Sequence, residues 1–293
     1  VINVITRAGA TPGASLYAST GRYGTQVYAA DASGMLSERL GAGASLSYQR
    51  SDGFPPLQDS PAPGNYDNTS VNAQLRYAAS DALTLRAQLW QASGLSAYSE
   101  FGAPSQENFL DASYATGAEW QGAGGAHARV TASQVISNIT QRQTPDYDRT
   151  RRNALDAQYS WLPLPQHEVT VGAVIDDEHT ESLSFGLPYD VHTHSQLGFL
   201  QDQLHRGAND LLLALGYNHH QTFGSYTTWN AEYGRTLTRA LRATLAAGTA
   251  YRAPDSTDLY GYGGNPALQP ETSHQLQLGL AWQATVSQDL SVS

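Results

Sequence analysis

The sequence predicts an all-β fold, an antiparallel transmembrane β-barrel, and three observations along the 293 residues support this prediction. Apolar and polar residues alternate strictly along the chain, and a period of two gives each strand one apolar and one polar face. The alternating runs have about 10 residues, the length of a tilted strand that crosses a bilayer. Short connections between the runs also alternate with long ones, as they do in a membrane barrel.

The alternation is clearest where leucines mark every second position. Between Leu40 and Tyr48, and again between Leu276 and Trp282, each apolar residue is followed by Gly, Ser, Ala or Gln. Aromatic residues such as Tyr48, Trp161 and Trp282 fall at the ends of such rows, where an interfacial girdle is expected. A soluble β-sandwich would share the alternation, but its strands usually have about 5–6 residues. The sequence therefore favours the membrane barrel.

Strands are expected in order along the whole chain, and about 14 of them can be placed. They fall near residues 13–21, 26–36, 40–51, 69–78, 82–93, 111–121, 126–137, 152–161, 167–178, 193–204, 209–219, 226–236, 240–251 and 272–283. The short connections are 37–39, 79–81, 122–125 and 236–239, and the long loops are 52–68, 95–111, 138–151 and 253–272. A further strand begins near Asp289, so the series is still running where the chain stops.

The composition excludes several classes of function. The formal net charge of -10 leaves no basic surface to neutralise a row of phosphates, so we expect no nucleic-acid partner. The absence of cysteine excludes disulfide scaffolds and cysteine-based zinc sites. No segment approaches the roughly 20 apolar residues of a membrane-spanning helix. No Gly-rich phosphate loop, cysteine nucleophile or zinc-protease helix is present, and we therefore expect neither an enzyme nor a cofactor.

Two segments resemble signatures of the TonB-dependent outer-membrane receptors. The opening residues Val1–Arg7 resemble the last strand of the plug, the domain that fills the barrel in this family. The segment Tyr251–Ser273, which we call the box, resembles the loop-to-strand box of the cobalamin and siderophore branches. It opens with Tyr-Arg-Ala-Pro and closes with Gly-Asn-Pro-Ala-Leu-Gln-Pro-Glu-Thr-Ser. The strand rhythm between the two segments resembles the cobalamin transporter, so the resemblance covers nearly the whole chain.

The resemblance implies a division of the chain into two parts. Residues 1–8 would be the C-terminal end of the plug domain, and residues 9–293 a transmembrane β-barrel that is truncated at its C-terminus. The family barrel has about 22 strands, so the strands placed here would form an incomplete barrel. We therefore expect these strands to form a curved, unclosed sheet whose first and last strands do not pair. The remaining strands of the family barrel would close it, because an open edge cannot face lipid.

The implied function is active transport of a scarce, bulky nutrient across the outer membrane of a Gram-negative bacterium, driven by the partner TonB through the plug. Cobalamin is the expected substrate, and a ferric siderophore is the alternative within the family. A passive porin or surface β-barrel is the alternative from a different class. Cobalamin is favoured because residues 95–111 and 253–272 contain no Lys or Arg, whereas a positive funnel would capture an anionic ferric chelate better.

Aromatic residues of the long loops are the candidate ligand-binding residues, since flat amphipathic rings suit a large planar ligand. They are Tyr98, Phe101, Tyr147, Tyr189, Tyr226, Tyr260 and Tyr262. Ordinary loop packing is the alternative for each of them. The glycines and prolines of the box likewise have a structural interpretation, because they stop one strand and turn the chain into the next.

No residue is expected to bind a metal. His192 and His194 share a strand face, and His219 and His220 lie at a strand end, but we interpret these histidines as exposed loop residues. The segment Asp255–Gly264 contains no histidine, which argues against heme, since the heme-uptake branch carries one there. The 6–8 oxygen ligands that calcium takes cannot be assembled from the acidic residues.

Two further expectations concern side chains directly. Leu75, Tyr159, Leu213, Leu245 and Leu278 should face lipid, and Arg76, Asp156, Asn230, Arg242 and Gln277 should face the lumen, because charge on the lipid side is costly. Arg252 should reach a carboxylate, either Glu271 or Asp255, because a guanidinium is best held by a bidentate partner.

Overall fold

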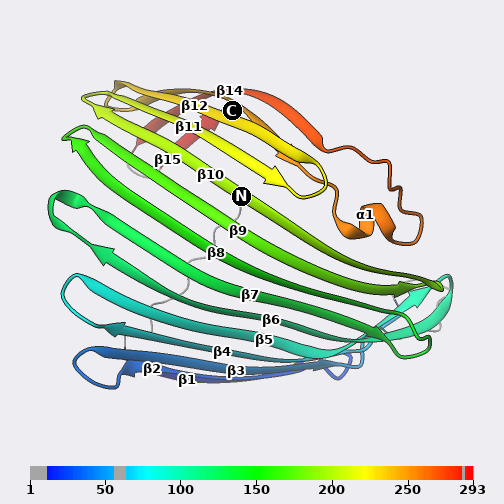
Figure 1. Cartoon of the computed structure of the whole chain (residues 1–293). Coiled ribbons are helices and arrows are strands. Elements are labelled where there is room, and N and C mark those ends of the chain that lie inside the picture. Colours follow the sequence, from blue (N-terminus) through cyan, green and yellow to red (C-terminus); the bar gives the residue numbers. More distant parts are fainter. Residues whose placement is uncertain (1–11, 56–63, 286–287, 293) are drawn as a thin grey trace.

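Consecutive strands pair side by side and form one antiparallel sheet of 15 strands, in the order β1 to β15 (Figure 1). The computed structural model describes residues 12–55, 64–285 and 288–292, so the predicted plug segment, residues 1–8, lies outside the described residues. The strands are β1 (Gly13–Thr20), β2 (Gln26–Met35), β3 (Leu40–Ser51), β4 (Tyr66–Ala78), β5 (Leu83–Glu100), β6 (Ala103–Gln121), β7 (His127–Gln141), β8 (Tyr147–Leu164), β9 (His167–Ser184), β10 (Leu187–Arg206), β11 (Asn209–His220), β12 (Gly224–Thr238), β13 (Leu241–Arg252), β14 (Glu271–Thr285) and β15 (Gln288–Val292). Within the described ranges no pairing joins β1 to β15, which confirms the predicted unclosed sheet.

Several strands are longer than the sequence predicts. β5 ends at Glu100 and β6 begins at Ala103, so the predicted loop 95–111 is wrong, and a two-residue turn takes its place. The predicted loop 138–151 is also wrong, because β7 and β8 occupy most of it. Backbone hydrogen bonds continue there into polar sequence, where hydropathy no longer marks the alternation of side chains. The loop predicted at the box is present between β13 and β14.

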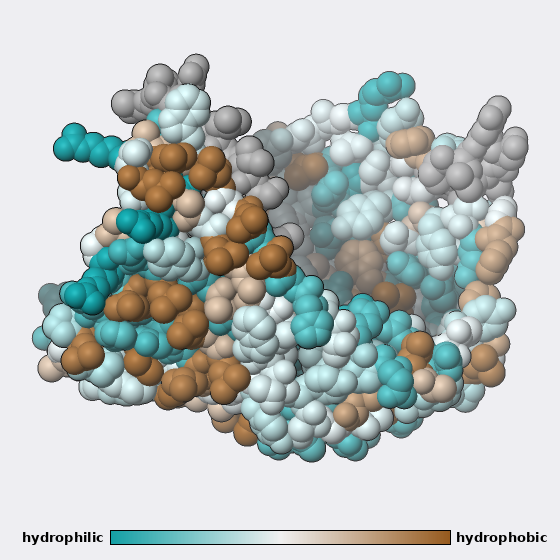
Figure 2. Space-filling model, turned by 90° about the horizontal axis from the view of Figure 1, so that it is seen from above, coloured by the Kyte–Doolittle hydropathy of each residue, from teal (hydrophilic) through white to brown (hydrophobic). Residues whose placement is uncertain are grey.

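The pairing register divides the sheet into two faces. Directly opposed residues on neighbouring strands share a face, so the pairings can be followed from β1 to β14. They place Leu75, Tyr159, Leu213, Leu245 and Leu278 on one face and Arg76, Asp156, Asn230, Arg242 and Gln277 on the other, as predicted. Seen from above, the sheet curves around a hollow in which hydrophilic side chains are prominent (Figure 2). We call the face with the leucines the outer face and the other the inner face.

The sheet has no hydrophobic core of its own. Among the described residues only Ala92, Ala112 and Leu259 are buried apolar residues, whereas large apolar side chains stay exposed along the outer face. We call this band the apolar belt; it includes Leu46, Leu75, Leu155, Val171, Ile175, Leu213, Leu245 and Leu278. Such a band is stable only where an apolar medium covers it.

Two ion pairs between strands lie on the inner face. Arg86 of β5 is 2.7 Å from Glu119 of β6, and Asp210 of β11 is 2.5 Å from Arg242 of β13, two strands away. These side chains are partly exposed, so the pairs contribute little to the stability of the sheet. The backbone ladder, which pairs every strand with its neighbours, is therefore the main interaction that holds the sheet together.

The chain between β13 and β14 forms the helix α1 (Ser256–Tyr260) and a series of turns. The Asp255 carboxylate caps α1 by accepting a hydrogen bond from the Asp258 N–H at 2.8 Å. Arg252 lies 3.9 Å from Glu271, as predicted, but its other carboxylate is Asp258 at 3.7 Å. Asp255 is not its partner because that side chain is used as the helix cap. In the described part of the chain, no helix is long and apolar enough to cross a membrane.

The two faces can be tested by placing a charge on each. Leu213 lies in the apolar belt and its neighbour Ala214 on the inner face. Leu213→Arg should lower the free energy of unfolding by about 2–4 kcal/mol if residue 213 is near the bilayer midplane, whereas Ala214→Arg should change it by about 0.5 kcal/mol or less. Denaturant unfolding of the full-length protein in lipid vesicles measures both. Equal losses would contradict the assignment of faces.

Candidate functional site

Six connections gather at the edge of the sheet that also carries α1, which we call the α1 rim (Figure 1). They join β1 to β2, β3 to β4, β5 to β6, β7 to β8, β9 to β10 and β11 to β12. β5, β6, β9 and β10 have 18 to 20 residues each, and they extend past the apolar belt to this rim. On the outer face of β9, for example, the belt ends at Ile175 and is followed by Asp177 and His179. The rim therefore stands beyond the apolar part of the sheet.

Three turns at the α1 rim have the same unusual backbone. Tyr23, Phe101 and Phe185 have φ of 58°, 48° and 50°, and they are the non-glycine residues with positive φ in the described part of the chain. Each is followed by a glycine with positive φ. Two consecutive residues of positive φ are what a tight two-residue hairpin turn requires. An aromatic residue in this conformation costs about 1–2 kcal/mol, so these turns hold aromatic rings at a place where stability alone does not favour them.

Two of these turns meet a residue of the box. The rings of Phe101 and Phe185 are 6.1 Å apart in an edge-to-face arrangement, and Phe185 lies 4.7 Å from the ring of Tyr262. We call these three residues the aromatic cluster. Their side chains remain largely accessible, with Phe101 at 92% and Tyr262 at 66%. Three rings from separate connections thus form an exposed apolar surface at the rim.

Tyr189, which lies in β10 shortly after the Phe185–Gly186 turn, joins α1 to the inner face of the sheet. Its hydroxyl lies 3.1 Å from the Thr257 hydroxyl and donates to the Asp148 carboxylate at 3.4 Å. Its ring is 6.3 Å from the ring of Tyr260. Because Tyr189 and Asp148 are inner-face residues of β10 and β8, these contacts hold α1 over the inner side of the sheet.

Acidic side chains continue along the inner face of β9, farther from the rim than Tyr189. Asp176 accepts a hydrogen bond from the Ser195 hydroxyl at 2.6 Å and pairs with Arg152 at 3.3 Å. Burial raises the pKa of the neighbouring Glu178 carboxyl above its ordinary value, and the Arg152 charge opposes that rise. The negative charges of Asp176 and Asp255 raise the pKa of Glu178 further.

The structure brings together some of the predicted ligand-binding residues and separates others. Phe101 and Tyr262 meet through Phe185, and Tyr189 meets Tyr260. Four of the seven are strand residues rather than loop residues, since Tyr98, Tyr147, Tyr189 and Tyr226 belong to β5, β8, β10 and β12. Tyr147 lies under Arg149 at 4.6 Å, and Tyr226 stacks on Tyr251 at 4.2 Å.

Phe185 of the aromatic cluster is not among the residues predicted from the sequence. Its signal is present in the sequence, because Phe101-Gly102-Ala103-Pro104 and Phe185-Gly186-Leu187-Pro188 repeat one pattern. A bulky residue before glycine is an uncommon composition for a tight hairpin turn, where Asn or Asp normally stands first. The pattern was therefore readable only as part of a longer loop.

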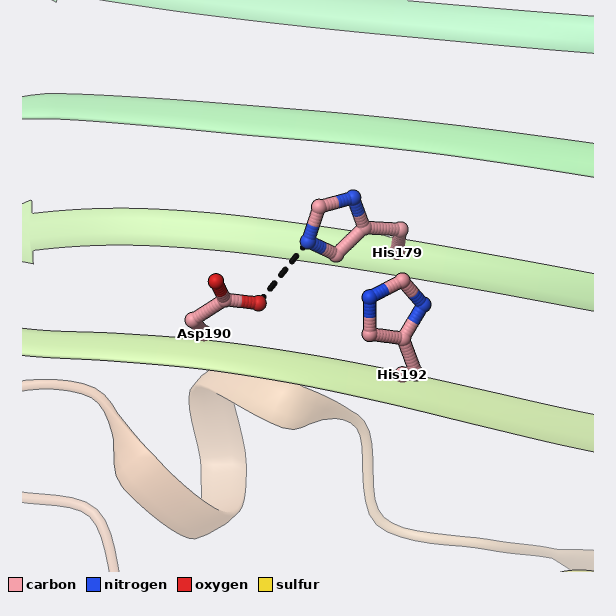
Figure 3. Close-up of side chains that lie close together, drawn as sticks. All are labelled: His179, Asp190 and His192. Atoms are coloured by element: carbon pink, nitrogen blue, oxygen red, sulfur yellow. Dashed lines mark hydrogen bonds and ion pairs between the residues drawn. The ribbon is translucent and has the colours of Figure 1, made fainter.

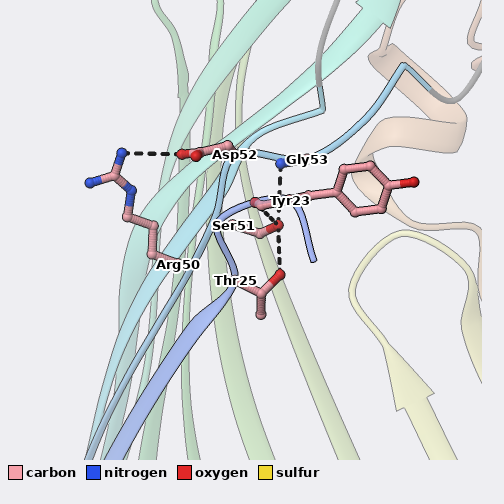
Figure 4. Close-up of polar contacts among 6 residues, drawn as sticks. All are labelled: Tyr23, Thr25, Arg50, Ser51, Asp52 and Gly53. Atoms are coloured by element: carbon pink, nitrogen blue, oxygen red, sulfur yellow. Dashed lines mark hydrogen bonds and ion pairs between the residues drawn. The ribbon is translucent and has the colours of Figure 1, made fainter. Parts of the chain in front are cut away.

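The third aromatic–glycine turn, Tyr23–Gly24, is fixed by a separate polar corner (Figure 4). The Ser51 hydroxyl accepts a hydrogen bond from the Gly53 N–H at 3.2 Å, donates to the Tyr23 carbonyl at 3.3 Å and lies 3.1 Å from the Thr25 hydroxyl. The ring of Tyr23 packs on Phe54 at 5.0 Å. This corner holds the β1–β2 turn against the end of β3.

Glu178 gives a pH dependence with a defined sign. A carboxyl whose pKa is raised on folding contributes stability below its unfolded pKa, and that contribution is lost as pH rises through the folded pKa. Glu178→Gln should therefore stabilise the protein at neutral pH, with the difference vanishing near pH 4, about the ordinary pKa of Glu. Unfolding of the full-length protein in detergent at both pH values measures this, with the exposed Glu168→Gln as control. A variant less stable than wild type at neutral pH would show that the charge of Glu178 stabilises the fold through Arg152.

Comparisons with known proteins agree with this geometry. The structure is similar to that of the siderophore receptor PirA from Pseudomonas aeruginosa, with 15% identity, a TM-score of 0.76, and coverage of 89% of this chain and 50% of that one. PirA from Acinetobacter baumannii has 15% identity and a TM-score of 0.77, over 94% and 51% of the two chains. The ferric enterobactin receptor PfeA from Pseudomonas aeruginosa has 14% identity and a TM-score of 0.76, over 95% and 52%. The chain thus spans about half the length of these receptors, and at this identity the likeness shows the fold alone.

The sequence also matches the family described as TonB dependent receptor-like, beta-barrel. The match covers residues 7–293, which is nearly the whole chain. None of the three receptors above is named for cobalamin, so the predicted cobalamin branch has no support from them. The alternating strands, the unclosed sheet and this match together establish that the chain belongs to the β-barrel family of the TonB-dependent receptors.

Proposed function

We propose that this protein imports a ferric siderophore of low net charge across the outer membrane of a Gram-negative bacterium, with TonB as its partner. Membership of the TonB-dependent receptor family supports energised transport rather than catalysis. The likeness to receptors named for siderophores and for ferric enterobactin supports an iron chelate over cobalamin. A passive porin, the alternative from another class, has no comparable support.

The charge class of the ligand is supported by the acidic inner face near the α1 rim. The inner-face carboxylates of β6, β8 and β9 at this height are Glu107, Asp111, Asp148, Asp176 and Glu178. The described inner-face residues of β6 to β9 at this rim include one arginine, Arg152. It is already paired with Asp176 at 3.3 Å. A polyanionic chelate would meet repulsion here. A tris-hydroxamate chelate, whose three negative charges cancel those of Fe³⁺, would not.

The aromatic cluster supplies the other half of the contact. Phe101, Phe185 and Tyr262 offer flat apolar rings at the entrance, above the polar hydroxyl of Tyr189. Rigid aromatic rings bind large ligands at low cost in side-chain entropy. An apolar entrance over a polar, acidic wall suits a bulky chelate with an amphipathic surface better than a small ion.

The substrate class is tested by equilibrium binding to the full-length protein in detergent. The probes are ferrichrome, a neutral tris-hydroxamate chelate, ferric enterobactin, a triply negative tris-catecholate chelate, and cyanocobalamin. We expect ferrichrome to bind at least about tenfold more tightly than ferric enterobactin, a difference of about 1.4 kcal/mol. Quenching of tryptophan fluorescence by the iron chelates gives the affinities, and equilibrium dialysis gives that of cyanocobalamin. Preference for ferric enterobactin would overturn the charge class, and tight binding of cyanocobalamin alone would overturn the siderophore assignment.

The role of the aromatic cluster is tested by removing its central ring. Phe185→Ala deletes the contacts with both Phe101 and Tyr262 and should weaken chelate binding about tenfold, the effect of a typical binding hot spot. Phe223→Ala is the matched control, because Phe223 also precedes a glycine at the α1 rim but packs on His220 instead. Both variants should fold normally, since both rings lie in turns. Equal effects of the two substitutions would remove the cluster from the binding site.

A further inference from the structure

The outer face of β9 and β10 carries two facing rows of metal-ligand side chains beyond the apolar belt. Asp177, His179 and Glu181 alternate along β9. In β10 they lie directly opposite His194, His192 and Asp190, respectively. Both rows follow Ile175 and its partner Gln196 on this face. Antiparallel pairing therefore gathers three imidazoles and three carboxylates on one surface of a rigid ladder.

The central part of these rows is compact (Figure 3). The rings of His179 and His192 are parallel, with an interplanar angle of 6° and centroids 3.9 Å apart. The His179 Nε2 atom lies 2.8 Å from the Asp190 carboxylate and 3.7 Å from that of Glu181. One ligand atom from each of His179, Asp190 and His192 can be chosen so that all lie within 4.8 Å of one another.

This arrangement differs from the other histidine–carboxylate pairs of the sheet. His205 and Asp210 form a single contact at 2.8 Å, and His167 and Asp202 one at 3.0 Å. Each of those pairs is satisfied as an ordinary surface interaction, which contributes little to stability. At His179 a second imidazole stacks on the first, and its ring adds a nitrogen that the His179–Asp190 hydrogen bond does not use.

The ligand atoms fit a tetrahedral metal ion after small side-chain rotations. Zinc binds imidazole nitrogen at about 2.0–2.1 Å in tetrahedral geometry, which places neighbouring ligand atoms about 3.3 Å apart. The two carboxylate side chains are free to rotate, since Asp190 is 66% exposed and Glu181 40%. Arg149 and Arg151 lie opposite Glu181 and His179 on β8 and oppose a cation, but the three carboxylates of the two rows outnumber them. Imidazole with carboxylate favours zinc, copper or nickel over magnesium or calcium.

We propose that His179, His192 and Asp190, with Glu181 as a further oxygen ligand, bind a divalent transition-metal ion of the zinc class. The interpretation of His192 and His194 as exposed loop residues is wrong, because both belong to β10. A bound ion would join β9 to β10 close to their shared turn, Phe185–Gly186. The site would thereby stiffen the hairpin that carries the central ring of the aromatic cluster.

The test is isothermal titration of the full-length protein with ZnCl₂, in detergent, after removal of any polyhistidine tag and treatment with a chelator. Wild type should bind one Zn²⁺ ion, and His179→Ala and His192→Ala should each weaken binding at least about tenfold. His205→Ala is the matched control, since it removes a histidine from a histidine–aspartate pair at the opposite edge and should leave binding unchanged. Hydrogen exchange provides a second measurement, in which Zn²⁺ should slow the amides next to Phe185–Gly186 in wild type and in His205→Ala only.

Two outcomes would overturn the proposal. One is the absence of Zn²⁺ binding to wild type at millimolar concentration, the weak limit of specific association at about −4 kcal/mol. The other is binding that persists unchanged in His179→Ala and His192→Ala, which would place the ion elsewhere.

Discussion

Each strand of this sheet must keep its register with both neighbours, because consecutive side chains point to opposite faces and a slip of one residue would exchange the two faces. The fifteen strands pair in sequential order, so the register of each strand fixes the register of the next, from β1 to β15. It keeps Leu75, Leu213 and Leu278 on one face although they lie far apart in the sequence. The described part of the sheet has almost no buried core, so the free energy of burial that orders most proteins comes here from the medium around the apolar belt.

The same ladder builds the candidate site by continuing past the apolar belt. β9 and β10 remain paired up to Ser184 and Leu187, so their turn stands far out on the α1 rim. The aromatic–glycine turns at this rim have a strained backbone and carry aromatic rings. Tyr189 holds α1 against the inner face. At the same distance from the rim, the inner and outer faces of the β9–β10 hairpin carry different kinds of side chain. Aromatic and acidic side chains line the inner face, and histidines with carboxylates line the outer face.

The fold and the two faces were predictable because hydropathy follows the period of two wherever lipid selects for it. Leu213 and Arg242 could be assigned to opposite faces for this reason. Beyond the apolar belt the selection disappears, so the strands through Tyr98 and His192 resembled loops although their backbone pairing continues. The contact between Phe101 and Phe185 depends on how two hairpins bend toward each other. No local sequence pattern predicts that bending.

The two-faced sheet in a lipid medium is tested most directly by nitroxide scanning of β11. The 293 residues contain no cysteine, so a single cysteine at each position from 211 to 216 can carry the label once any cysteine elsewhere in the full-length protein has been replaced. In the full-length protein reconstituted in bilayers, collision with dissolved oxygen should be high at 211, 213 and 215 and low at 212, 214 and 216, because oxygen concentrates in lipid. Uniform accessibility, or an alternation with the opposite phase, would contradict the account, since the leucines of β11 would then not face lipid.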